Sequence, residues 1–298
     1  MIRDSIGDRI FTSLIYVFLA VLAFSTFYPF WNSLVISFNE GIDTSKGGIT
    51  FWPRVFTLDN YKIVFEDPRL MNGFVIAALR TVIGTVTAIL ATSIFAYGMS
   101  KKELMGRKYY MIMCIITMYF AGGLIPTYML IRGLGLFNSF WVFIIPGLIS
   151  VWNMIIFRTF FQGLPQGLEE SAKMDGCGNW GTFFRIVLPL SGPVVATLSL
   201  FTAVAHWNEW FVASIYITNE KLLPIQTVLR QILFSNIASE QLSNVDISSI
   251  AHLNAAKKIT SKSLTMATIM VATIPIVCVY PFLQKYFVKG VLVGSLKE

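Results

Sequence analysis

The sequence predicts an all-α integral membrane protein with six membrane-spanning helices. Only 13% of its 298 residues are charged, whereas 55% are hydrophobic. This charged fraction is about half of that usual in soluble domains. Six segments are also long and apolar enough to cross a hydrocarbon core about 30 Å thick. Together these observations argue against an ordinary soluble enzyme, a disordered chain and a disulfide-stapled secreted module.

The predicted spans form one bundle over residues 1–298, without a visible internal repeat or a linker between domains. In chain order, the spans cover about residues 10–37, 73–99, 109–131, 140–161, 192–217 and 264–287. The first span begins like a signal peptide, with Arg3 and Arg9 before an apolar run. Because that run is too long and no small-residue cleavage site ends it, we expect an uncleaved helix.

The positive charges of the short loops predict the orientation of the chain. Four cations lie between the second and third spans, namely Lys101, Lys102, Arg107 and Lys108, whereas the next loop holds only Arg132. Lys and Arg gather in cytoplasmic loops. We therefore expect the first of these loops, and with six spans both termini, in the cytoplasm. The same rule explains the net charge of +7 without a nucleic-acid partner.

The sequence shows no sign of a catalytic centre of its own. It contains no P-loop, zinc-protease or serine-hydrolase motif. Its two histidines, His206 and His252, and its three widely separated cysteines form no metal-ligand spacing. We predict a non-catalytic membrane protein that binds neither nucleotide nor metal.

A long, patterned segment separates the fourth and fifth spans. Helix connectors commonly have about two to eight residues, but this one runs from 163 to 189. Pro165 suits the start of a helix, Glu169 and Glu170 complement the dipole there, and Gly176 would stop or bend it. We expect two short helices that meet at Gly176 and face the cytoplasm. An interfacial helix on lipid is the alternative, although its acidic residues suit an anionic leaflet poorly.

This segment resembles the EAA loop of ABC-importer membrane subunits. The family pattern is Glu-Ala-Ala, three residues, Gly, nine residues and then Ile-x-Leu-Pro, and the corresponding residues here are Glu170, Ser171, Ala172, Gly176, Ile186, Leu188 and Pro189. The one departure, Ser171, is also small. Residues 28–31, 56–61 and 207–210 resemble maltose-transporter-type carbohydrate permeases. Residues 117–126 resemble the subset linked to complex or acidic oligosaccharides, such as alginate or pectin fragments.

The resemblance implies how such a chain would work. In this family the EAA helix sits in a cleft of a cytoplasmic ATPase subunit and moves with it. The residues that would carry this coupling are Glu170, Ser171, Ala172, Asp175, Gly176, Ile186, Leu188 and Pro189. ATP and Mg would bind to the ATPase, and this chain would bind no cofactor. The implied partners are a second homologous permease chain in a heterodimer, two ABC ATPase subunits and an extracytoplasmic solute-binding protein, in a bacterial cytoplasmic membrane.

Polar and aromatic residues inside the predicted spans mark a candidate sugar path. The candidates are His206, Trp207, Asn208, Glu209, Trp210, Trp152 and Asn153. On a continuous helix, His206, Glu209 and Trp210 would share one face. A charge at mid-bilayer costs about 2.5–3.5 kcal/mol, so we expect Glu209 to face a cavity or a neighbour. Hydrogen bonding between helices explains these residues equally well. We expect Arg80, in the second span, to snorkel towards the interface.

Two other functional classes compete with the importer subunit. An ion-coupled secondary transporter for a polar solute would need intramembrane carboxylates and broken helices, and Glu209 is the one clear carboxylate in a predicted span. A membrane enzyme would need a nucleophile–base or metal constellation, but His206 and His252 fall in different segments. The patterned loop therefore favours a permease subunit of an ATP-driven importer that translocates an oligosaccharide.

Overall fold

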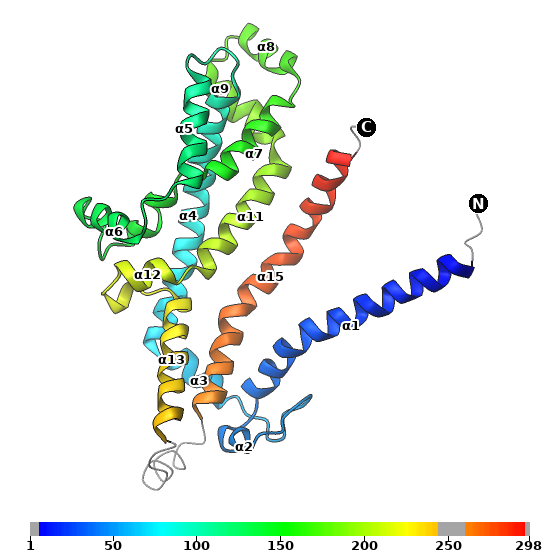
Figure 1. Ribbon diagram of the computed structural model, residues 1–298, viewed down its shortest axis with the longest axis vertical. Helices are drawn as coiled ribbons and strands as arrows, with labels where there is room; N and C mark the ends of the chain where they lie inside the picture. The colour runs from blue at the N-terminus through cyan, green and yellow to red at the C-terminus, as the bar shows by residue number, and fades with distance from the viewer. Residues whose placement is uncertain (1–5, 244–259, 296–298) are drawn as a thin grey trace. The chain divides into compact units, whose positions relative to one another are not determined.

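A computed structural model describes residues 6–243 and 260–295, which contain helices and no strand (Figure 1). Their contacts divide the chain into two compact units. The first comprises the described residues among 1–68 and 229–273, and the second comprises those among 69–228 and 274–298. The helices α13 (Ile225–Ser243) and α15 (Ser261–Ser295) contribute residues to both units.

The first unit contains the long helix α1 (Ile6–Ser37) and the short helices α2 (Gly41–Ser45) and α3 (Asp59–Glu66). The most apolar part of α1 has a mean hydropathy of 2.2, and none of it is buried by protein. Burial begins in its last turn, at Val35 and Ile36. An apolar surface of this kind suits contact with lipid, as the sequence predicts for residues 10–37.

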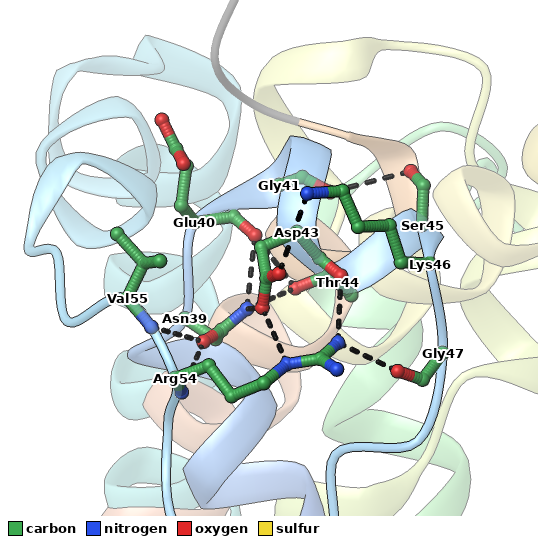
Figure 2. Close-up of polar contacts among 10 residues, drawn as sticks. All are labelled: Asn39, Glu40, Gly41, Asp43, Thr44, Ser45, Lys46, Gly47, Arg54 and Val55. Atoms are coloured by element: carbon green, nitrogen blue, oxygen red, sulfur yellow. Dashed lines mark hydrogen bonds and ion pairs between the residues drawn. The ribbon is translucent and has the colours of Figure 1, made fainter.

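A buried amide organises the segment that follows α1 (Figure 2). The Asn39 side chain is fully buried. Its Oδ1 accepts hydrogen bonds from the backbone N–H groups of Arg54 (2.8 Å) and Val55 (3.0 Å), and its Nδ2 donates to Asp43 Oδ2 (3.1 Å). Arg54 Nε also donates to Asp43 Oδ2 at 2.9 Å, and Arg54 Nη2 donates to the carbonyl of Gly47 at 2.6 Å. These bonds hold residues 39–47 against residues 54–55.

The second unit begins with the long helix α4 and continues through shorter helical pieces. These pieces are α4 (Pro68–Ser100), α5 (Arg107–Tyr119), α6 (Leu124–Gly133), η1 (Phe140–Phe143), η2 (Ile145–Gly147), α7 (Val151–Gln162), α8 (Gln166–Met174), α9 (Asn179–Thr182), the π-helical turn η3 (Phe183–Val187), α10 (Leu188–Leu190), α11 (Gly192–Asn208), α12 (Phe211–Tyr216) and η4 (Glu220–Leu222). Figure 1 shows α8 and α9 at one end of this unit.

Aromatic side chains form much of the core of the second unit. Phe157 and Phe161 of α7 stack with ring centroids 5.6 Å apart, and Phe183 of η3 lies 5.2 Å from Tyr97 of α4. The core also takes in Cys114 of α5, together with residues of α11. Because each of these helices contributes buried side chains, α4, α5, α7, α11 and η3 form one packed body.

Three helical segments are long and apolar enough to span a membrane alone, and three bent pairs raise the possible number to six among the described residues. The single segments are α1, α4 and residues 261–278 of α15. The pairs are α5 with α6, bent by 114°, the η1–η2 segment with α7, bent by 46°, and the α9–α10 segment with α11, bent by 81°. The fifth predicted span, 192–217, is therefore not one helix, since α11 ends at Asn208 and α12 begins at Phe211.

The Asn39 network predicts an acid-sensitive loop. Hydrogen bonding from Asn39, followed by the Arg54 guanidinium, holds the pKa of the Asp43 carboxyl below its ordinary value of 3.8. A lowered pKa stabilises the folded loop above that ordinary value, and the stabilisation is lost as the pH falls through the lowered pKa. Hydrogen exchange of residues 38–58, corrected for intrinsic rates, should stay slow from pH 8 to 5 and accelerate below about pH 4.

The Asp43→Asn variant provides the control for this prediction. It keeps the shape of the side chain but removes the titrating group, so its loop should exchange faster at neutral pH and show no acid transition. An identical acid transition in Asp43→Asn and the unmodified chain would assign the transition to another group.

Candidate functional site

A cleft of about 510 Å³ lies among α4, the η1–η2 segment, α7 and α11. Its lining includes apolar side chains such as Phe143 and Phe201. The polar residues along its wall are Arg80, Ser150, Asn153, Thr202, His206 and Glu209. Three residues of the predicted sugar path, Asn153, His206 and Glu209, are therefore brought together in one place.

The other four residues of the predicted path do not line this cleft. Trp207 is buried and sets its ring edge against Phe74, with centroids 5.6 Å apart. Asn208 is exposed, and Trp152 of α7 is 64% exposed. Trp210 packs edge to face against Phe211 at 5.6 Å. Trp207 and Asn208 lie on other faces of α11 than His206, and Trp210 follows the end of that helix.

Hydrogen bonds of Glu209 and Arg80 stabilise the break between α11 and α12. Glu209 has an extended backbone, with ψ of 118°. Its Oε1 accepts hydrogen bonds from the N–H groups of Phe211 (2.6 Å) and Val212 (3.0 Å) at the start of α12. Its carbonyl accepts a hydrogen bond of 2.9 Å from Arg80 Nη1. Backbone groups freed by a broken helix need such partners in a bilayer.

Arg80 is buried, so the expectation that it snorkels to the interface is wrong. Only 2% of Arg80 is exposed, and its guanidinium carbon lies 4.5 Å from the centroid of the Phe143 ring. Its Nε has no hydrogen-bond partner within the described part of the chain. A signal was present in the sequence, because Arg80, Gly84 and Ala88 recur every four residues and place a cation and two small residues on one helix face.

Gly84 allows α4 and α11 to approach closely at the cleft. A Cβ atom added to Gly84 would lie 2.6 Å from Nε2 of His206, a distance that real Cβ contacts do not reach. The imidazole therefore occupies the space that any larger residue at position 84 would need. The missing side chain of Gly84 thus leaves the space in which His206 packs against α4.

The patterned loop forms the two short helices that the sequence predicts, α8 and α9, on either side of Gly176. Gly176 has φ of +80°, which favours glycine. Its N–H donates to the carbonyl of Lys173 (3.0 Å), and the next N–H, of Cys177, donates to the carbonyl of Ala172 (2.9 Å). This pair of bonds is a Schellman motif, which ends a helix by turning the chain away.

Exposure divides the EAA residues into two groups. Glu170 and Ser171 are exposed on α8, as are Asp175 and Gly176 directly after it and Pro189 in α10. Ala172 is only 4% exposed, and Ile186 and Leu188 are half-buried near the core residue Val187. The loop therefore has a surface free to meet a partner and a side that packs within the second unit.

Lys101, the residue that follows α4, attaches α8 to the rest of the second unit. It forms an ion pair with Glu169 of α8, and its Nζ lies 4.1 Å from the centroid of the Tyr97 ring. Gln162 Nε2, at the end of α7, donates to the carbonyl of Ser100 at 3.4 Å. A second cleft, of about 460 Å³, opens beside these groups and contains Glu170 in its lining. Sequence reasoning missed the role of Lys101, which depends on a contact 68 residues away.

Comparison with known proteins identifies the family. Residues 1–293 match the family described as "Binding-protein-dependent transport system inner membrane component". The chain belongs to this family. It is therefore a permease component of an ATP-driven importer in the inner membrane, and ATP hydrolysis takes place on a separate subunit. This confirms the resemblance drawn from the EAA pattern and gives no support to an ion-coupled transporter.

Two curated relatives and one solved structure are similar over nearly the whole permease. The polygalacturonan/rhamnogalacturonan transport system permease protein YtcP of Bacillus subtilis (strain 168) is 39% identical over 290 residues, which cover 97% of this chain and 99% of the relative. Protein LplC of the same organism is 40% identical over 291 residues, covering 98% and 96%. A bacterial ABC transporter involved in the import of the acidic polysaccharide alginate matches with a TM-score of 0.87 at 26% identity, covering 96% of this chain and 100% of that one.

The Gly84–His206 contact predicts that a single methyl group disturbs the cleft. Gly84→Ala should leave the solubilised permease about 1–3 kcal/mol less stable than Gly98→Ala, because both changes favour the helix but only the Cβ at position 84 meets the imidazole. Gly98→Ala lies on the same helix, and apart from the backbone of its own helix no described atom lies within 4 Å of the added Cβ, so this change should be neutral or slightly stabilising. Thermal unfolding measures both changes.

His206→Ala should relieve the clash when combined with Gly84→Ala. The double variant is expected to be more stable than the sum of the two single changes, which a double-mutant cycle measures. Strictly additive effects, or an equal loss in Gly98→Ala, would show that His206 does not occupy the space beside Gly84.

Proposed function

We propose that this permease subunit translocates an acidic oligosaccharide of the pectin-fragment kind, delivered by an extracytoplasmic solute-binding protein. The observation that carries this proposal is the 39% identity to a polygalacturonan/rhamnogalacturonan permease over 97% of the chain. The structural likeness to the alginate importer points to the same chemistry, since its substrate is also an acidic polysaccharide. The cleft with Arg80, Asn153 and His206 offers groups that suit sugar hydroxyls and carboxylates.

We propose that α8 couples the permease to the ATPase. Its exposed residues Glu170, Ser171 and Asp175 are free to enter a groove on a partner protein, as a short amphipathic helix does. Ala172 is buried within this chain, so its small size serves packing inside the permease. The four cations between the second and third predicted spans support a cytoplasmic location for that loop. With six spans, α8 and both termini would lie on the same side.

Movement of α8 would reach the cleft through contacts inside the second unit. The Lys101–Glu169 ion pair joins α8 to the end of α4. The Phe183–Tyr97 contact joins η3 to α4, and α10 leads directly into α11. Since α4 and α11 both line the cleft, closure of the ATPase subunits around ATP and Mg would rock these helices as a rigid body.

The proposed assembly contains four membrane-associated chains and a delivery protein. This chain would pair with a second homologous permease in a heterodimer, each permease would receive one ATPase subunit, and lipid would cover the outer helices. The family name supports the solute-binding protein as a partner. The permease would bind no cofactor of its own.

Uptake of labelled trigalacturonide by host cells tests the proposed function. Cells that lack this chain should lose uptake, and the restored chain should return it. Gly176→Pro, which cannot adopt the positive φ, and Glu170→Lys, which reverses an exposed charge, should each abolish most uptake while the amount of permease in the membrane stays unchanged.

Two matched variants control this experiment. Gly176→Asn should keep most uptake, because Asn tolerates the left-handed conformation that ends α8. Glu66→Lys places the same charge reversal on α3, at another exposed site, and should have no effect. Normal uptake in both Gly176→Pro and Glu170→Lys would eliminate the coupling role of α8.

A further inference from the structure

We propose that Arg80 recognises a carboxylate of the substrate, an inference that rests on the proposed function above. Arg80 lies on α4, lines the 510 Å³ cleft, and is 2% exposed. A buried guanidinium beside a cleft is costly unless its charge and its N–H groups find partners. This chain supplies some of these partners and leaves others to another molecule.

The chain satisfies part of the guanidinium. Nη1 donates to the carbonyl of Glu209, and the guanidinium carbon lies over the Phe143 ring, 4.5 Å from its centroid. The Nε–H is buried and has no acceptor among the described residues. Arginine carries five N–H donors in a planar fork, so donors remain after the bond to Glu209. Two features therefore indicate a ligand, namely the cleft that Arg80 lines and the buried Nε–H that has no acceptor within the described residues.

The charge of Arg80 is attracted by the nearby carboxylate of Glu209, but no contact ion pair neutralises it within the described residues. Glu209 lies in the same cleft, but its Oε1 accepts the N–H groups of Phe211 and Val212 at the start of α12. A helix start offsets negative charge, so Glu209 is engaged with α12. Arg80 remains the cation that an entering carboxylate would meet.

The surrounding groups fit a uronate better than a neutral apolar ligand. A guanidinium matches the two oxygens of a carboxylate with two parallel hydrogen bonds. Asn153, whose Nδ2 donates to Thr202 Oγ1 at 3.3 Å, and Ser150 provide polar groups for sugar hydroxyls along the same wall. A sugar ring that carries both hydroxyls and a carboxylate is the ligand that uses all of these groups.

Two substitutions at Arg80 separate recognition from structure. Arg80→Gln keeps an N–H donor for the Glu209 carbonyl but removes the charge, whereas Arg80→Lys keeps both a donor and the charge. In host cells with the complete transporter, Arg80→Gln should lower trigalacturonide uptake by about tenfold or more, the effect of losing a charge-assisted hydrogen bond. Arg80→Lys keeps the charge but loses the planar fork, so its uptake should lie between that of Arg80→Gln and that of the unmodified chain, with a raised KM. Arg132→Gln removes an exposed arginine of α6 and should match the unmodified chain.

The outcomes distinguish this inference from the function on which it rests. Suppose that Arg80→Gln and Arg80→Lys lose uptake equally, although each variant is present in the membrane at its normal amount. This result would overturn carboxylate recognition and leave Arg80 as a structural residue. The methyl ester of the same trimer gives a second readout, since Arg80→Gln should lower the ratio of acid to ester uptake. Absence of trigalacturonide uptake by the unmodified transporter would instead overturn the proposed function.

Discussion

A helix that breaks inside a bilayer must supply hydrogen-bond partners for the backbone groups that it frees, because the hydrocarbon offers none. The junction of α11 and α12 meets this requirement with two residues. The Glu209 carboxylate accepts the first N–H groups of α12, and Arg80 donates to the Glu209 carbonyl. The break therefore fixes a carboxylate and a guanidinium in the wall of one cleft. The groups that hold the backbone at the break are thus the groups that make this cleft polar within an apolar bundle.

The same body of helices connects this cleft to α8. The Schellman motif at Gly176 ends α8, and the Lys101–Glu169 pair attaches α8 to the end of α4. Aromatic packing of Tyr97, Phe161 and Phe183 joins α4, α7 and η3. Packed cores move as blocks and do not deform continuously, so in the proposed coupling a displacement of α8 would be transmitted to the helices that line the cleft.

Hydropathy was sufficient to find α1 and α4, because about 20 consecutive apolar residues are a strong signal. It could not show the 114° bend between α5 and α6, since composition records the length of an apolar run but not its direction. The bend lies at residues 120–123, where Gly123 has φ of +85°. Gly122 and Gly123 lie at this bend, but their presence in the sequence did not predict it.

The candidate site was predictable where a residue acts locally and not where it depends on a distant contact. Gly176 was predicted to bend the loop because a glycine after a helical stretch has one common use. Arg80 was assigned to the interface because the partners that bury it, Phe143 and Glu209, lie 63 and 129 residues further along the chain. His206 and Glu209 line one cleft as expected, but Trp210 does not join them, because the helix ends at Asn208.

Photo-cross-linking from position 170 tests the coupling account most directly. A photoreactive amino acid in place of Glu170 would be activated in native membranes, and mass spectrometry would identify the attached protein. The account predicts attachment to the ATPase subunit, and no such product when the same group replaces Glu66 on α3. Attachment from position 170 to lipid or to this chain alone, in membranes that contain the assembled ATPase, would contradict it.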